Sequence, residues 1–371
     1  MAEAVAQRAL SQDEEKRLSR IGYKADNERA ATCVIVDQGV PHIGVTDNQV
    51  EVMTLADALA RYPWVQDLMF GLVDPEDDEH VKLASERTET PIGHFVRVHE
   101  GARVRLPIEL FTLIETAQAR QFIHNVTVIE KGASVELVTG SATPEAVRHG
   151  HHVSISETYL REGAECRSLS VEQWGEDMEV HSFARTHVGK NARHVDNQIK
   201  MSGLRRHFSQ SKTIVEEGGA SNDQAVIFAP SGTERIMHSE THLNGAGASA
   251  ESVTRMVTAG GRIVNHSMLV GAVGDTKGYL GCDGLKLSDE GEILSTPSLL
   301  AKSARSQLSH EASIGMISQE KMAYLMATGM SEDAARDLII QGFLHLNEQN
   351  MPDAIRAEVK TMIAAAKSGA M

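Results

Sequence analysis

The sequence is poor in aromatic residues, which make up only 4% of its 371 residues. Enzymes that act on polysaccharides stack sugars on aromatic side chains, so this composition argues against a sugar-cleaving β-helix enzyme. Basic residues are also outnumbered, since 36 Lys and Arg stand against 51 Asp and Glu and the net charge is −15. A nucleic-acid-binding surface needs excess positive charge, so we expect no nucleic-acid partner.

Long apolar runs are missing as well. No segment approaches the roughly 18 apolar residues that a membrane-spanning helix requires. The first residues, MAEAVAQRALSQDEEKR, lack the apolar core of a secretory signal. We therefore expect a cytoplasmic protein with no membrane partner.

Cysteine is the third scarce residue, and Cys33, Cys166 and Cys282 lie far apart in the chain. Three distant cysteines form neither a disulfide framework nor a Cys-x-x-Cys metal knuckle. The glycine-rich segment GAVGDTKG, residues 271–278, lacks the Gly-Lys-Ser/Thr ending of a phosphate-binding loop. We therefore expect no tightly bound nucleotide on this chain.

What the sequence does contain, from about residue 93, is a series of short runs in which apolar and polar residues alternate. Turns between these runs repeat, as EGA at 100–102, KGA at 131–133 and EGA at 162–164, with their glycines 31 residues apart twice. A repeat of this length with strand-like runs predicts a β-helix, in which each coil stacks on the next. A β-sandwich with recurring hairpin turns is the alternative.

Helical patterns flank the β-region, which we place at 93–312. The N-terminal region, 1–92, is mixed and partly helical, and Ser11 with Glu14 has the spacing of a capping box. The C-terminal region, 313–371, has three apolar stripes of helical period, beginning near Met322, Ala335 and Ile355. The predicted fold is therefore mostly β, a parallel β-helix with an N-terminal mixed region and a C-terminal helical cap.

The segment GCDGLKLSD, residues 281–289, carries one candidate for chemistry, Cys282. His310 and Glu311 follow 28 and 29 residues later, which is close to one repeat. Neighbouring coils lie about 4.8 Å apart, so the repeat can place His310 beside Cys282. Thiolate, imidazole and carboxylate together can bind iron. The alternatives are a buried cysteine that acts as a small apolar residue and a surface His-Glu pair at a helix start.

The segment RHGHHVS holds the densest group of histidines. His149 and His151 are two residues apart and share one face of a predicted strand, about 6.6 Å apart. They form half of a metal site of the kind found in cupin-like barrels, and the alternative is a pair of solvated strand residues. No third ligand is evident nearby.

Residues 281–343 carry a family resemblance. The segment resembles the signature region of the SufB/SufD family, the scaffold subunits of the Suf iron–sulfur cluster assembly machinery, and the resemblance extends over about 95–346. VEQWGED around Trp174 is similar to a Val-Gln-Asn-Trp stretch of that family. The residues that fall on the signature pattern are Cys282, Asp283, Pro297, His310, Glu311, Ala312, Gly342 and Phe343.

The resemblance implies a right-handed parallel β-helix that dimerises through its end. It also implies a non-enzymatic scaffold on which a transient iron–sulfur cluster forms at the dimer interface before transfer to acceptor proteins. A SufC-type ABC ATPase would supply the ATPase activity and dock on the C-terminal helices. In the family, the cysteine matching Cys282 and the histidine matching His310 are divided between SufB-type and SufD-type chains. On these grounds we expect Cys282, His310 and Glu311 to form the assembly site. The apolar residues expected at the ATPase contact are Met322, Leu325, Leu338, Ile339 and Phe343.

This chain departs from the family pattern in three ways. Ser141, in GSATP, stands where SufB-type chains often carry a cysteine proposed to receive sulfur, and Ser309 replaces the first glutamate of Glu-His-Glu. The chain also keeps both Cys282 and His310. We therefore expect a minimal scaffold whose homodimer supplies both ligands reciprocally, with a SufD-like paralogue as the alternative partner. The sulfur donor and any role for a flavin stay open.

Two other functional classes remain beside this interpretation. One is a cupin-like or β-helix metal enzyme that uses His149 and His151. The other is an interaction module without chemistry of its own.

Overall fold

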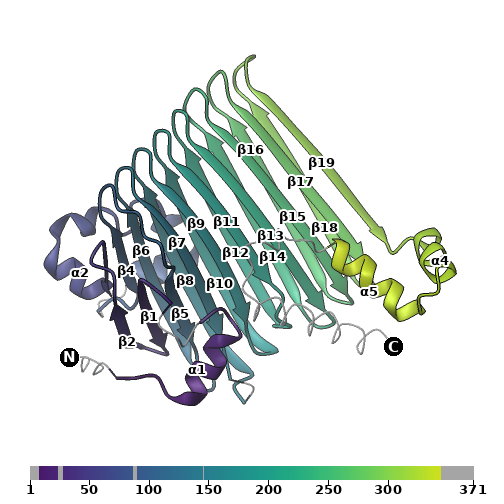
Figure 1. Ribbon diagram of the computed structural model, residues 1–371, viewed down its shortest axis with the longest axis horizontal. Coiled ribbons are helices and arrows are strands. Elements are labelled where there is room, and N and C mark those ends of the chain that lie inside the picture. The colour runs from purple at the N-terminus through teal and green to yellow at the C-terminus, as the bar shows by residue number, and fades with distance from the viewer. Residues whose placement is uncertain (1–7, 24–27, 87–89, 145, 344–371) are drawn as a thin grey trace.

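The computed structural model describes residues 8–23, 28–86, 90–144 and 146–343, which form a long stack of strands with short helices at both ends (Figure 1). The helices in chain order are α1 (Gln12–Ser19), α2 (Leu55–Arg61), the 3₁₀ turns η1 (Pro63–Asp67) and η2 (Pro75–Asp77), α3 (Glu79–Ser85), α4 (Gln319–Ala327) and α5 (Glu332–Phe343). The strands are β1 (Ala31–Val36), β2 (Gly39–Val45), β3 (Val50–Thr54), β4 (His94–Val98), β5 (Ile108–Leu113), β6 (Arg120–Ile129), β7 (Ser134–Ala142), β8 (His149–Leu160), β9 (Glu165–Gln173), β10 (Asp177–Val188), β11 (Arg193–Lys200), β12 (Arg206–Val215), β13 (Ala220–Pro230), β14 (Glu234–Leu243), β15 (Ser249–Ala259), β16 (Arg262–Gly271), β17 (Lys277–Lys286), β18 (Glu292–Ala301) and β19 (Gln307–Met316).

The strands form a parallel β-solenoid. From β4 onward, consecutive strands alternate between two sheets, so that each coil contributes one strand to each. The 10-stranded sheet runs β19-β17-β15-β13-β11-β9-β7-β5-β1-β2, and the 9-stranded sheet runs β18-β16-β14-β12-β10-β8-β6-β4-β3. The predicted β-helix is confirmed, and the sandwich is excluded because strands adjacent in the sequence belong to opposite sheets.

The repeated turns found in the sequence stack on one another. Gly132 and Gly163 both have φ of +65°, a left-handed conformation that costs glycine little. Asn191 and Asp275 take the same role with φ of 56° and 62°. The Gly132 N–H donates to the carbonyl of Glu162 in the next turn at 2.9 Å, so the turns form a hydrogen-bonded ladder beside the sheets.

The interior of the solenoid has an apolar column and a polar part. Leu160, Val188, Val215 and Leu243 are paired in register on successive coils and are all fully buried. Because each coil contributes one apolar residue to this column, the alternating apolar and polar runs recur along the chain. The polar part contains buried charged groups and a cavity of about 260 Å³.

The N-terminal end of the solenoid is closed by strands of opposite direction. β2 pairs antiparallel with β1, and β3 pairs antiparallel with β4, at the ends of the two sheets. β1 itself lies parallel to β5, so the N-terminal region supplies strands to the solenoid as well as helices. α3 and the turns before it cover the outer face of the 9-stranded sheet, where Val73 and Val81 pack on Val153.

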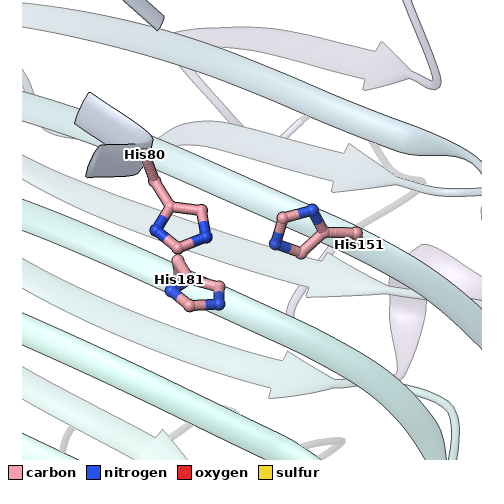
Figure 2. A group of neighbouring side chains, drawn as sticks. All are labelled: His80, His151 and His181. Atoms are coloured by element: carbon pink, nitrogen blue, oxygen red, sulfur yellow. The ribbon is translucent and has the colours of Figure 1, made fainter. Parts of the chain in front are cut away.

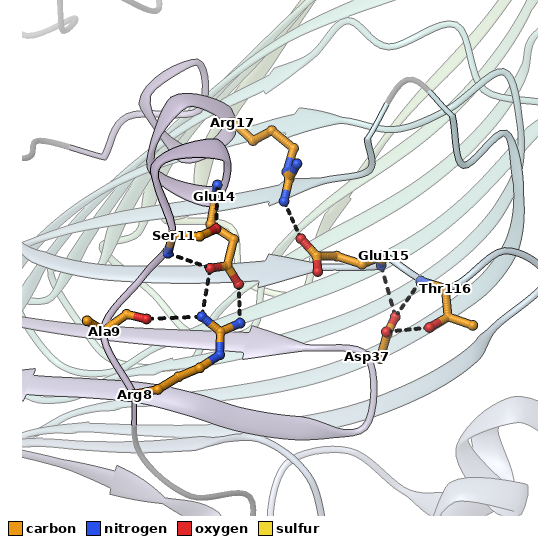
Figure 3. A network of polar contacts seen from close by, with 8 residues as sticks. All are labelled: Arg8, Ala9, Ser11, Glu14, Arg17, Asp37, Glu115 and Thr116. Atoms are coloured by element: carbon orange, nitrogen blue, oxygen red, sulfur yellow. Dashed lines mark hydrogen bonds and ion pairs between the residues drawn. The ribbon is translucent and has the colours of Figure 1, made fainter.

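Helix α1 is joined to the first coils by polar contacts (Figure 3). Ser11 and Glu14 form the predicted capping box, and Arg8 pairs with the Glu14 carboxylate and holds its pKa down to about 2. Arg17 forms an ion pair with Glu115 of the loop after β5. The helix therefore begins at the predicted residue and is held against the 10-stranded sheet.

The chain ends, within the described residues, with two short helices after the last strand. α4 and α5 match two of the predicted helical stripes, and the Ser331 hydroxyl accepts a hydrogen bond from the Ala334 N–H at 3.2 Å. The third predicted stripe, from Ile355 to Ile363, lies outside the described residues. Across the described part of the chain, every helix is too short or too polar to cross a membrane.

Candidate functional site

The C-terminal end of the solenoid is open. β18 and β19 are the last strands of their sheets, and no further described strand pairs with them. Large apolar side chains on both strands are exposed, although the residues paired with those of β18 one coil earlier are buried. Leu299 is 36% exposed beside Leu269 at 1%. The other large apolar residues exposed on these two strands are Leu294, Leu300, Ile314 and Met316.

Cys282 lies one strand in from this open end. It is on β17, with 1% of its surface exposed, and its side chain packs with Met237, Met256 and Ile263 inside the solenoid. The Asn265 amide donates to its sulfur at 3.7 Å. The thiol is therefore enclosed by the last coils and has no direct contact with solvent.

Cys282 differs electrostatically from the other two cysteines. Burial raises the pKa of the Cys33 and Cys166 thiols to about 12. Burial also raises the pKa of Cys282, but hydrogen bonds from the hydroxyls of Ser295 and Ser267 and from the Asn265 amide oppose that rise. These polar groups around sulfur stabilise its thiolate form, which is the form that binds metal. Sequence reasoning missed them, because they come from β16 and β18.

His310 lies on the face of β19 that carries Cys282 on β17. His310 pairs with the buried Leu280, and Ala312 pairs with Cys282. Paired residues of neighbouring strands point to the same face, so the backbones of Cys282 and His310 are diagonal neighbours, roughly 8 Å apart from the strand spacing and rise. The repeat thus places Cys282 and His310 on adjacent strands, as the sequence predicted. The imidazole itself is exposed at the open end.

Glu311 points to the opposite face of β19. It pairs with Gly281, and its carboxylate accepts a hydrogen bond from the Tyr279 hydroxyl at 3.4 Å on the outside of the solenoid. Because successive residues of a strand alternate faces, Glu311 does not share the inner face with Cys282 and His310 in this single chain.

The two candidate metal ligands of RHGHHVS, His149 and His151, have different surroundings in the structure. His149 is exposed, with its ring nitrogen 3.5 Å from Asp177. His151 instead lies with His80 of α3 and His181 of β10, and ligand atoms of these three side chains are all within 4.8 Å of one another (Figure 2). Burial and the His80 imidazole lower the pKa of His151, and burial together with the His80 and His151 imidazoles lowers the pKa of His181 to about 4. No pattern in the sequence pointed to His80, which comes from a distant helix.

A buried polar network lines the solenoid interior near Trp174. Arg235 is fully buried and donates to the Glu172 carboxylate, to His207 at 2.9 Å and to the carbonyl of Ser202 at 2.8 Å. Ser141 and Glu172 line the cavity of about 260 Å³. The family-like VEQW segment therefore contributes to the interior of the middle coils, far along the chain from Cys282.

The residues predicted for ATPase docking differ in their exposure. Met322 of α4 is buried, and Phe343 of α5 packs against the apolar cluster along the 10-stranded sheet. Leu338 is 47% exposed, and Tyr324 and Met326 of α4 are also exposed. Leu325 and Ile339 are half-buried. Both helices thus expose apolar side chains, Tyr324 and Met326 on α4 and Leu338 on α5.

Comparison with known proteins places these features in one family. The profile of the SUF system FeS cluster assembly, SufBD core domain, matches residues 112–343. The chain is 30% identical over 366 residues to an iron–sulfur cluster assembly SufBD family protein of Methanothermobacter thermautotrophicus, covering 97% of this chain and 89% of the relative. A protein of the same description from Archaeoglobus fulgidus is 28% identical, with 95% of each chain covered. SufB of Bacillus subtilis is 22% identical over 79% of this chain and 63% of its own.

Proposed function

Because the chain belongs to the SufBD family of iron–sulfur cluster assembly proteins, we propose that it is a scaffold that builds a cluster at the open end of its solenoid. The observation that carries this proposal is the position of Cys282. Its thiol is enclosed by polar donors one strand from a bare end, on the same face as His310 of the last strand.

The open end supports assembly of two chains there. No described strand pairs with the outer edges of β18 and β19, and exposed apolar residues of the last coil lie beside these edges. A second copy, related by a two-fold axis, would cover both with the same surface. Each Cys282 would then face His310 of the other chain as well as its own.

Cluster building requires Cys282 to become accessible. At rest the thiol is covered by the last coil, so iron and sulfide reach it only when β18 and β19 shift from β16 and β17. α4 begins at Gln319, three residues after β19 ends at Met316, and α5 packs against the same sheet. We propose that a partner ABC-type ATPase binds the exposed surface of α4 and α5 and moves these strands through that short connection.

In the assembly step this chain supplies ligands and exclusion of solvent. Cys282 loses its proton to the medium and binds iron as a thiolate, with Asn265, Ser267 and Ser295 donating hydrogen bonds to the sulfur. His310 binds through a neutral imidazole nitrogen. Glu311 would join them only from the partner chain or after a rearrangement, because it faces outward in the single chain. Mixed thiolate and imidazole ligation favours release of the cluster to an acceptor over permanent storage.

Anaerobic reconstitution with iron and sulfide tests the role of Cys282. We expect Cys282→Ser to lose the visible absorbance of the cluster while it keeps its fold and its partner ATPase. Cys166→Ser is the matched control, because Cys166 is equally buried but has apolar neighbours. A normal cluster yield in Cys282→Ser would refute the assignment.

A mixing experiment tests whether the ligands come from two chains. If sites are shared across a two-fold interface, Cys282→Ser and His310→Ala chains together restore one intact site in each mixed dimer, or roughly a quarter of all sites at random exchange. If Cys282 and His310 of the same chain form the site, mixing restores nothing. Light scattering that shows only monomers, alone and with the ATPase, would contradict the dimer itself.

A further inference from the structure

Three histidines from distant segments meet on the outer face of the 9-stranded sheet, away from the open end (Figure 2). His80 lies on α3, His151 on β8 and His181 on β10. The rings of His80 and His181 are stacked with centroids 3.8 Å apart, and His151 stands edge-on to both, 5.5 Å from His80 and 5.2 Å from His181.

The strand register explains how two of these residues come together. His151 pairs with Glu179, and His181 pairs with Val153, so the two histidines are diagonal neighbours on the same face. The N-terminal region brings the third. Buried Glu157 of β8 accepts hydrogen bonds from the backbone N–H groups of Leu72 and Val73, at 2.6 and 3.1 Å. This anchor holds the segment that leads into α3 against β8.

One contact orients the His80 ring in the way that metal ligands are usually oriented. The Asp78 carboxylate lies 3.1 Å from His80 Nδ1 and also accepts the His80 backbone N–H at 2.7 Å. A carboxylate on Nδ1 favours the tautomer that carries its proton there and leaves Nε2 free as a ligand. Asp78 therefore caps α3 and fixes the imidazole through the same oxygen.

A second observation points independently to a missing partner. His181 Nδ1 is buried and has no hydrogen-bond partner among the described residues. A buried polar nitrogen without a partner is costly, because it loses water and gains nothing in return. Three imidazoles packed against one another also repel as soon as more than one is protonated.

We propose that His80, His151 and His181 bind one divalent first-row transition metal of the Zn²⁺ class, with the fourth position open to water or another ligand. Imidazole suits these metals, and three protein ligands with one open position are typical of reactive zinc sites. Zn–N bonds of about 2.1 Å require nitrogens roughly 3.4 Å apart in a tetrahedral site. The three imidazole nitrogens now lie within 4.8 Å of one another, so side-chain rotations that move each nitrogen by about 1 Å would bring them to that distance.

The site would act as a clamp between two parts of the chain. Its ligands join α3 of the N-terminal region to two successive coils of the solenoid, so metal binding stabilises the docked position of α3. The three-histidine site is separate from Cys282. A failure of the cluster proposal would therefore not affect this metal-site proposal, and the reverse also holds.

Calorimetric titration of the full-length, tag-free protein with ZnCl₂ and CoCl₂ tests the proposal. We expect one equivalent bound and visible Co²⁺ bands, retained in Cys282→Ser. His80→Ala, His151→Ala and His181→Ala should each lower the affinity at least about 100-fold, and Asp78→Asn, which keeps an N-cap oxygen, roughly tenfold. His149→Ala is the matched control, because His149 is on the same strand but exposed.

A second readout follows the clamp itself. Zn²⁺ should raise the melting temperature of the wild type and of His149→Ala but not that of His151→Ala, because only a metal bound to the folded state stabilises it. Absence of stoichiometric binding by the folded wild type would overturn the proposal. Equal losses in His149→Ala and His151→Ala, or normal binding in His80→Ala, would also overturn it.

Discussion

The two ends of the solenoid are finished in different ways. At the N-terminal end, β2 and β3 run against the direction of the coils, and the Arg8 N–H donates to the Pro41 carbonyl of β2 at 2.8 Å. At the C-terminal end, β18 and β19 continue the parallel ladder and stop, with their apolar residues exposed. The antiparallel strands hinder a further parallel coil at the N-terminal end. The parallel edges and exposed apolar side chains at the C-terminal end favour further strand pairing.

The contrast between the two ends indicates where the chain can associate and where it can change shape. A closed end with antiparallel strands and covering helices stabilises a single chain. Within the described residues, the last coil has neighbouring strands on one side only, so we expect its strands to be the ones that move or bind a second copy. The one cysteine with polar partners lies at that end.

The largest expected effect comes from placing a charge at the open end. Ile314→Asp should raise the dissociation constant of the proposed dimer at least about 100-fold, because a buried unpaired carboxylate costs more than ~3 kcal/mol. Val45→Asp on β2, where Val45 is 46% exposed, should leave it unchanged. Sedimentation velocity over a concentration series measures both. Equal behaviour of the two variants would break the distinction between the ends.

A cavity mutation should separate the closed coils from the last coil. In the Ile314→Asp monomer, Leu160→Ala should lower the free energy of unfolding by about 3 kcal/mol, because Leu160 is fully buried. Leu299→Ala should cost less than about 1 kcal/mol, because much of its side chain is already in water. Denaturant unfolding measures the two values, and a similar cost at both positions would mean that the last coil is covered even in the monomer.

The pH dependence of stability should show how far water reaches the interior of the middle coils, where Asp223 lies on β13. Burial, together with the Asp196 carboxylate, raises the pKa of Asp223 to about 7. The unfolded chain releases that proton near pH 4, so this group makes the protein less stable as pH rises from about 4 to 7, by at most ~1.4 kcal/mol per unit. Asp223→Asn should remove this slope in denaturant unfolding at several pH values. An unchanged slope would indicate that Asp223 is solvated.

The smallest effect concerns the turn ladder, which continues from one end to the other. Gly132→Ala should cost about 1 kcal/mol, because φ of +65° brings the alanine Cβ close to the backbone and alanine has no polar side chain to offset that strain. Asp275→Gly, at the equivalent turn near the open end, should change stability by less than ~0.5 kcal/mol, because aspartate tolerates that conformation. Thermal unfolding resolves the difference. A large loss in Asp275→Gly would show that the aspartate side chain contributes more than its backbone.

Much of the fold could be predicted because it depends on local patterns. The spacing of the turn glycines indicated the coil, the capping box at Ser11 and Glu14 marked α1, and the apolar stripes marked α4 and α5. The antiparallel closure by β2 and β3 was not predicted, because short strands look alike whichever direction their partner runs.

The repeat in the amino-acid sequence sets the length of each coil, and this length makes the strands that carry Cys282 and His310 neighbours. Residues separated by one repeat must meet when every coil has nearly the same length. Which side chains share a face depends on the tertiary structure. His310 and Glu311 are consecutive in the sequence, yet His310 faces inward and Glu311 faces outward. The tertiary structure alone also brought His80 to His151 and His181, because a helix packed across the coils follows no repeat and is positioned by its contacts.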